Sequence, residues 1–227
     1  MKKLIALLLC LLLVCSSAFA EETQPIYTED FEDGEHDFYF WGGDGLNDAC
    51  QLLIEEEDGN HYLRCICNTG DGPNGYIHFL FGPSLRNFDY TCRVVPYIKN
   101  PDYNWLKILF RAQDAKSEGL PGGEGGENNS YMFNIWEWRG TFTIKSVKGR
   151  KSESNPLAEN EDFWFDPDVW YEIRVEAREN HIAVYVDDEL CVEYTDPEDF
   201  RPDGIFGFCS WGANFLIDDI SITAVEG

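Results

Sequence analysis

The last quarter of the chain is a succession of short runs in which apolar and polar residues alternate, and this pattern constrains the fold most. The runs cover residues 170–177, 182–188, 204–208 and 215–222, with turn residues between them and no helical pattern. Alternation with a period of two is typical of strands that bury one face, because successive side chains point to opposite sides of a sheet. The region therefore predicts antiparallel strands joined by short connections.

The same pattern extends through the rest of the chain, and no stripe of helical period follows residue 21. Glu179-Asn180 and Arg139-Gly140 suit tight hairpin turns, and Asp187-Asp188 marks another tight corner. Short strands at near-regular spacing predict an all-β fold, a two-sheet antiparallel β-sandwich of the jelly-roll kind. The predicted strands are residues 50–56, 61–68, 75–81, 87–98, 104–112, 130–138, 141–148, 169–178, 181–194, 203–211 and 214–224.

The first 20 residues are predicted to be a secretory signal peptide. Lys2 and Lys3 precede an apolar stretch, and Ala18-Phe19-Ala20 forms a cleavage site. The stretch is too short for a membrane span, and no later segment is long and apolar enough for one. A lipoprotein signal with Cys15 as the lipidated residue is an alternative that would attach the protein to the cell surface. Residues 21–227 are expected to form a single, secreted, monomeric domain.

The charge of the chain limits its partners. It has 42 acidic and 17 basic residues, a formal net charge of −25. Such a surface repels phosphate backbones, so nucleic acid is not an expected partner. It is compatible with neutral sugars and with divalent cations, and it also keeps an extracellular protein soluble.

The cysteines leave two interpretations open. Export permits disulfides, whereas a core this large does not need them, and a cysteine inside an apolar run serves as a small buried hydrophobe. Cys65 and Cys67 share one face of a predicted strand, so they are badly placed to bond to each other. The cysteines after the predicted leader are Cys50, Cys65, Cys67, Cys92, Cys191 and Cys209.

Several catalytic and cofactor motifs are absent or out of context. Residues 70–75 match G-x-G-x-x-G, but a predicted strand follows where a dinucleotide fingerprint needs a helix. The chain has no G-x-S-x-G, H-E-x-x-H or C-x-x-C, and its histidines lack ligand spacing. It also lacks the E-x-D-x-x-E run of sandwich glucanases. The Gly-rich residues 117–129 predict a long surface loop, either a lid over a binding face or a tolerated insertion.

One face of two predicted strands combines aromatic and polar side chains. Alternation places Trp105, Lys107 and Arg111 on the side of their strand opposite Leu106 and Ile108. Sugars stack on aromatic rings and need fixed polar partners for their hydroxyls, so this mixture predicts a carbohydrate platform. The alternative is that individual tryptophans fill a second layer of the sandwich. The predicted ligand-binding residues are Arg111, Asn134, Trp136 and Trp138, with Trp105 at the edge.

Two acidic segments lie near the two ends of the chain, at residues 30–34 and at Asp218-Asp219. First and last strands often pair in sandwiches, so these acids are expected to approach one another. Calcium takes six to eight oxygen ligands, of which such a pair supplies several. The alternative is two ordinary solvated turns.

Six segments follow one another along the chain: Asp30–Gly34, Ile108–Arg111, Tyr131–Phe133, Trp170–Val175, Ile182–Asp187 and Leu216–Ile220. In this order they resemble the landmarks of the concanavalin A-like lectin and glucanase jelly rolls. The most similar groups are the laminin-G-like modules, the levan-binding-type carbohydrate modules and the 3-keto-disaccharide hydrolase domain. The resemblance implies that Arg111 lies on the concave face, and that Asp218, with Glu32 as an early partner, holds a structural calcium ion.

The sequence therefore predicts a secreted, non-catalytic, lectin-like domain that recognises an oligo- or polysaccharide on its concave face. A glycan-cleaving hydrolase or lyase acting on the same face is the first alternative, because this fold hosts binders and enzymes alike. An extracellular adhesin or protein-interaction domain is the second.

Overall fold

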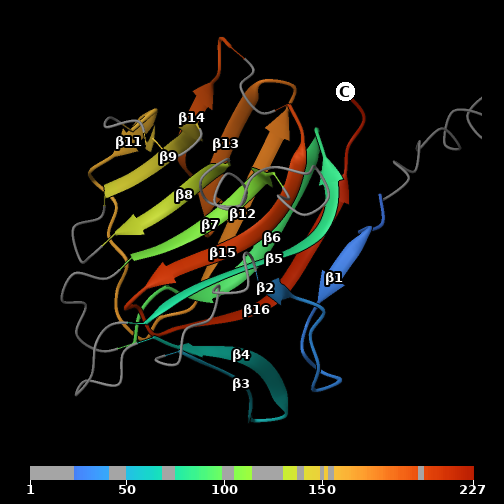
Figure 1. The fold of residues 1–227 in the computed structure, drawn as a ribbon, viewed down its shortest axis with the longest axis vertical. Helices are drawn as coiled ribbons and strands as arrows, with labels where there is room; N and C mark the ends of the chain where they lie inside the picture. The colour runs from blue at the N-terminus through green and yellow to red at the C-terminus, as the bar shows by residue number, and fades with distance from the viewer. Residues whose placement is uncertain are drawn as a thin grey trace, which may run out of the picture.

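The computed structural model forms a sandwich of two antiparallel β-sheets that curve over one another (Figure 1). It describes residues 23–40, 50–67, 75–98, 105–113, 130–136, 141–148, 151–152, 156–198 and 202–227. All regular elements in these ranges are strands, which confirms the predicted all-β, two-sheet sandwich. Nothing in these ranges qualifies as a membrane-crossing helix.

Sheet A runs in the order β14-β13-β12-β6-β16-β4-β3, and β1 also pairs with β16. The pairing of β1 with β16 brings the beginning and the end of the fold together, as expected for terminal strands. The strands of sheet A are β1 (Tyr27–Glu29), β3 (Gln51–Glu57), β4 (Asn60–Ile66), β6 (Phe88–Val95), β12 (Tyr171–Arg178), β13 (His181–Val186), β14 (Glu189–Thr195) and β16 (Phe215–Ala224).

Sheet B runs in the order β10-β9-β8-β7-β15-β5-β2, and β11 pairs with β9. Its strands are β2 (Tyr39–Phe40), β5 (Tyr76–Leu85), β7 (Trp105–Ala112), β8 (Tyr131–Trp136), β9 (Thr141–Lys148), β10 (Lys151–Ser152), β11 (Ala158–Asn160) and β15 (Gly204–Trp211).

The core between the sheets is rich in aromatic rings. Phe206 of sheet B packs edge-to-face against Phe88 of sheet A, with ring centroids 4.7 Å apart, and also contacts Tyr90. Phe79 and Phe208 extend this layer. All five side chains are buried. Large rings give the core most of its apolar area, and edge-to-face packing adds specific geometry.

The predicted turns differ in how far the structure describes them. Glu179 and Asn180 connect β12 to β13 as a two-residue hairpin, and Glu179 has a positive φ of 51°. Asp187 and Asp188 both have positive φ and divide the single predicted strand 181–194 into β13 and β14. The Arg139-Gly140 turn lies outside the described residues.

The strands that sequence periodicity missed are β1, β2, β10 and β11, which have two or three residues each and lie at sheet edges or ends.

A β-bulge interrupts sheet B where β15 passes β7. Ile205 pairs with Ala112 and Gly207 with Leu109, so two residues of β7 stand where one is expected. Arg111 lies at this irregularity with a φ of 49°. Gly204 approaches it so closely that a Cβ atom there would lie 2.3 Å from the Arg111 carbonyl carbon. A bulge changes which side of the sheet the following side chains occupy.

Candidate functional site

The outer face of sheet B, opposite the aromatic core, carries a polar row across five strands. The register pairs Cys209 with His78 on one side and with Lys107 on the other, and Lys107 pairs with Asn134. The row continues to position 143 of β9. Directly paired residues point to the same side of a sheet. His78, Cys209, Lys107 and Asn134 therefore lie on one face, although they come from four separate strands.

An aromatic row runs parallel to the polar row, two residues along each strand. Tyr76 pairs with Trp211, Trp211 with Trp105, and Trp105 with Trp136. These positions share the outer face with the polar row because strand side chains alternate. The structure thus brings together three of the predicted positions: Trp105, Asn134 and Trp136. We refer to the two rows together as the ladder face.

Side-chain contacts link the two rows. The Nζ atom of Lys107 lies 3.8 Å from the centre of the Trp105 ring, within the range of a cation–π interaction. Tyr76 packs edge-to-face on Trp105 with ring centroids 6.3 Å apart. The Tyr76 hydroxyl lies 3.5 Å from Nδ1 of His78 and 3.3 Å from the Cys209 thiol. The ladder face is therefore a connected set of aromatic and polar groups.

Asn134 is the most unusual residue of the ladder face. It is only 3% exposed, and its Oδ1 atom has no hydrogen-bond partner among the described residues. A buried amide oxygen without a donor is costly, and buried polar atoms in native proteins are nearly always paired with protein or water. Oδ1 of Asn134 is thus an acceptor for a donor that a ligand hydroxyl or a water molecule can supply.

A third row continues the outer face in an apolar form. Leu80, Leu109 and Met132 are all buried and belong to a second, smaller apolar cluster. The register also pairs position 143 with Glu159 of β11, so the polar row ends in one carboxylate at its β11 end. Glycoside hydrolysis usually needs two carboxylates that face each other, and the described ladder-face positions supply only this one.

Arg111 does not lie on the ladder face, which corrects the expectation from simple alternation. It is fully buried, and its guanidinium donates to the carbonyl oxygens of Arg86 and Glu179. The physical reason is the bulge, which turns Arg111 to the core side while Ala112 takes the outward position. We therefore leave Arg111 out of the binding surface. Trp138, the other predicted residue, lies outside the described residues.

The structure places Glu32 and Asp218 against the first two residues of β4, His61 and Asn60. Glu32 accepts from the backbone N–H of His61 and pairs with its Nδ1, both at 2.9 Å. Asp218 accepts from Nδ2 of Asn60 at 2.9 Å and from its neighbour's backbone N–H at 2.8 Å. The terminal strands have thus brought the two acidic segments together, as expected.

The surroundings of the two carboxylates do not fit a calcium site. Their oxygens already accept hydrogen bonds, and Arg93 Nη1 lies 3.8 Å from Asp218. In the part of the chain that the structure describes, no group of three or more potential ligands gathers. Burial raises the pKa of Asp218, whereas the hydrogen bonds from His61 lower the pKa of Glu32. A calcium ion would have to displace these donors.

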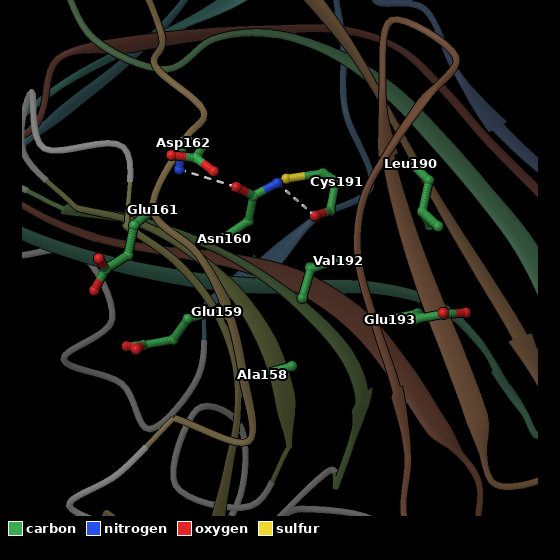
Figure 2. Close-up of a pocket in the computed structure, with 9 residues that line it drawn as sticks. All are labelled: Ala158, Glu159, Asn160, Glu161, Asp162, Leu190, Cys191, Val192 and Glu193. Atoms are coloured by element: carbon green, nitrogen blue, oxygen red, sulfur yellow. Dashed lines mark hydrogen bonds between the residues drawn. The ribbon is translucent and has the colours of Figure 1, made fainter.

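Carboxylates gather instead at an edge pocket of about 380 Å³ between β11 and β14, where the edges of the two sheets meet (Figure 2). Asn160 organises it, donating to the Cys191 carbonyl oxygen at 2.8 Å and accepting from the backbone of Asp162 at 3.0 Å. Figure 2 shows the side chains of Glu159 and Glu193 pointing in opposite directions. These two carboxylates therefore do not face each other across the pocket, as an acid pair for glycoside hydrolysis would.

A second hollow of about 540 Å³ lies beside β3, next to the segment that follows β1. Leu52, Leu53 and Ile54 line it together with His36. Glu35 lines it as well, so the hollow combines apolar side chains with a carboxylate and an imidazole.

Sequence reasoning missed the contribution of β5 to the ladder face. Tyr76 and His78 belong to an apolar run that reads as plain core, and only the pairing of β5 with β15 brings them beside Trp105 and Lys107. Alternation within β5 does indicate that Tyr76 and His78 share one face of that strand. It does not indicate which strands lie beside β5 in the sheet.

A family model described as the 3-keto-alpha-glucoside-1,2-lyase-like domain matches residues 26–223 of this chain. No curated protein matches the sequence at a significant level.

Solved structures share the fold at low sequence identity. Carbohydrate binding module CBM66 from Bacillus subtilis aligns with a TM-score of 0.56 and 15% identity, over 79% of this chain and 96% of its own. The exoplasmic/lumenal domain of VIP36, in a form bound to Ca²⁺ and mannose, aligns with a TM-score of 0.55 and 12% identity, over 84% of each chain.

An enzyme shares the fold as well. A GlcNAcα1-4Gal-releasing endo-β-galactosidase from Clostridium perfringens aligns with a TM-score of 0.59 and 11% identity, over 88% of this chain and 62% of its own. These likenesses show that the chain shares the jelly-roll fold of these structures. The family model over residues 26–223 supports a concanavalin A-like domain that binds or acts on carbohydrate.

Proposed function

The chain belongs to the family of 3-keto-alpha-glucoside-1,2-lyase-like domains, and on that premise we propose that it is a secreted domain that binds a carbohydrate, without cleaving it, on the ladder face. The observation that carries the proposal is the aromatic row beside a polar row that contains Asn134, a buried residue whose Oδ1 has no partner among the described residues. Trp105 offers a ring for stacking, and Lys107 offers hydrogen-bond donors.

The character of the described face favours binding over hydrolysis. Its polar groups include an imidazole, an ammonium, an amide, a thiol and the Tyr76 hydroxyl, which suit hydrogen bonding to sugar hydroxyls. Hydrolysis by the usual route needs a carboxylic acid and a carboxylate on opposite sides of the scissile bond, and the described rows supply one carboxylate, that of Glu159. The acidic surroundings elsewhere favour a neutral sugar, because a net charge of −25 repels anionic polymers at long range.

A lyase acting on the same face is the second candidate, and the family description favours it. Elimination needs a base positioned near an acidic C–H of the sugar rather than a pair of carboxylates. His78 and Tyr76 lie 3.5 Å apart on the ladder face and are the groups that could transfer a proton there. His78 is fully buried, so a substrate would have to reach it through the rows around it.

A glycan array combined with a product assay separates the two candidates. Purified protein is applied to an array of neutral and acidic oligosaccharides and is then incubated with every glycan it retains. Binding without new reducing ends or unsaturated sugars supports the non-catalytic proposal. Turnover that is lost in His78→Gln, with binding retained, supports the lyase. Capture of a protein partner with no glycan bound would favour the adhesin.

Calcium is not part of the proposed mechanism. The VIP36 domain was solved with Ca²⁺ and mannose together, but Glu32 and Asp218 are held here by nitrogen donors. The residues as arranged serve to fix the β3–β4 turn against β16.

A further inference from the structure

The ends of β3 and β4 bring two cysteines into direct opposition. Gln51 pairs with Ile66 and Leu52 with Cys65 in this antiparallel ladder. One further step along the same register places Cys50 opposite Cys67. Cys65 is then the diagonal neighbour of Cys50, and such neighbours are typically about 7–8 Å apart, farther than a direct pair.

The backbone of Cys67 shows which kind of pair this is. Its N–H donates to Oδ1 of Asn214 at 2.8 Å, and its carbonyl oxygen accepts from the N–H of Gly75 at 2.6 Å. Neither group is therefore used toward Cys50, which makes this a non-hydrogen-bonded pair. The Cα atoms of such a pair are typically about 4.5 Å apart, within the range of about 4.4–6.8 Å that a disulfide spans.

The two thiols are already in contact in their reduced state. Cys50 and Cys67 are 6% and 0% exposed, and both belong to the main core. A hydrogen bond between the thiols lowers the pKa of Cys50 and raises that of Cys67. Cys50 is thus the member of the pair that ionises first, and the thiolate is the form that attacks a disulfide.

We propose that Cys50 and Cys67 form an intrachain disulfide when the chain folds in an oxidising compartment, whereas Cys65 and Cys92 stay reduced. The oxidant is a disulfide, such as oxidised glutathione or an oxidoreductase. The Cys50 thiolate attacks one sulfur of the oxidant and releases one thiol. The Cys67 thiolate then attacks the Cys50 sulfur and releases the second thiol, so the oxidant gains the two electrons that the cysteines lose.

The bond would fix a corner that supports the ladder face. Cys67 is hydrogen-bonded to Gly75, the residue before Tyr76 in the aromatic row, and Gly75 accepts in turn from the N–H of Gly212, the residue after Trp211. The disulfide also closes the loop between residues 50 and 67. Closing such a loop restricts the unfolded chain and so stabilises the folded state. It is expected to raise the melting temperature without being required for glycan binding.

Peptide mapping tests the proposal directly on the full chain. The protein is reduced in denaturant, refolded with oxidised and reduced glutathione, blocked with iodoacetamide, and digested. Fragmentation between Cys65 and Cys67 distinguishes the two candidate partners of Cys50. We expect Cys50 linked to Cys67, with Cys65 and Cys92 alkylated. We also expect a melting temperature several degrees higher than for the reduced protein.

Two variants sharpen the test. Cys67→Ser should abolish the melting difference between oxidised and reduced protein, whereas Cys65→Ser, the diagonal control, should retain it. Mapping the unmodified chain needs neither variant, so poor folding of a serine variant leaves the test intact. The proposal is overturned if Cys50 and Cys67 both remain alkylated after oxidative refolding, or if Cys50 is linked to Cys65.

Discussion

The guanidinium of Arg111 donates to the carbonyl oxygen of Arg86 at 2.6 Å from Nη2 and 3.2 Å from Nε. The acceptor lies in the connection between β5 and β6, which belong to opposite sheets. Nη2 also reaches the carbonyl oxygen of Glu179, in the β12–β13 hairpin. One buried side chain thus satisfies the backbone of two turns and ties one end of the sandwich together.

Replacing Arg111 is therefore expected to affect stability. Arg111→Met leaves two carbonyl oxygens without their donor, and each such loss costs about 1–3 kcal/mol, so we expect unfolding free energy to fall by about 2–5 kcal/mol in urea titrations. Arg174→Met, on a partly exposed side chain stacked on Tyr185, should cost less than about 1 kcal/mol. A folded Arg111→Met protein of normal stability that no longer binds glycan would restore Arg111 to the binding surface.

Tyr131 and Asp196 predict a second stability effect. Both are buried, and the Tyr131 hydroxyl of sheet B donates to the Asp196 carboxylate at the end of β14 in sheet A. A hydrogen bond to a charged group contributes about 1.5–3 kcal/mol, so Tyr131→Phe should lower the unfolding free energy by that amount. Tyr185→Phe is the control, with an expected change within about 0.5 kcal/mol. Equal effects in the two variants would show that the Asp196 contact contributes nothing.

How much of the fold and of the ladder face could be predicted from the sequence differs from strand to strand. Alternation placed the strands and turns well where runs were long, as in β12 and β13, because burial of one face leaves a period-two trace. The partnership of Trp105 with Asn134 and Trp136 followed from neighbouring strands in sequence. The side of the sheet on which Arg111 lies could not be predicted, because a β-bulge interrupts the alternation of side chains and leaves no signal in the residues around it.

Tyr76, His78 and Cys209 escaped prediction for a different reason. Each enters the ladder face only through β15, which is inserted between β5 and β7 although it lies far from both in the sequence. Pairing between distant strands is set by how the whole sheet assembles, and local residue patterns do not encode it.

The His61–Glu32 pair predicts a specific pH dependence. Hydrogen bonding to Glu32 raises the pKa of His61 above its ordinary 6.5. The hydrogen bonds that Glu32 accepts, chiefly from the backbone N–H of His61 and then from its imidazole, lower the pKa of Glu32 below 4.5. The contribution of His61 is fully present below pH 6.5 and is lost as the pH rises through its folded pKa. The contribution of Glu32 is present above pH 4.5 and is lost as the pH falls through its folded pKa.

An NMR titration of the imidazole measures this pair. His61 should titrate above 6.5 in the unmodified chain and move back toward 6.5 in Glu32→Gln. A His61 pKa that Glu32→Gln leaves unchanged would show that the pair does not form in solution.

Chelation is expected to leave the fold unchanged. A ligand that binds only the native state raises the melting temperature by mass action, and the carboxylates of Glu32 and Asp218 are already hydrogen-bonded without one. EDTA should therefore shift the melting temperature by less than about 1 °C. A calcium-dependent rise that disappears in Asp218→Asn would instead assign a metal to this turn.

The central claim is that the ladder face binds a glycan. Its most direct test takes a glycan that the array identifies and measures its affinity by calorimetry for the unmodified protein, two ladder-face variants and one control variant. Trp105→Ala should weaken binding by about 1–3 kcal/mol in free energy, the range for losing a stacked ring and its neighbours, and Asn134→Ala should also weaken it. Trp164→Ala, an exposed tryptophan outside the ladder face, should bind normally. Unchanged affinity in Trp105→Ala and Asn134→Ala, with folding intact, would contradict the account.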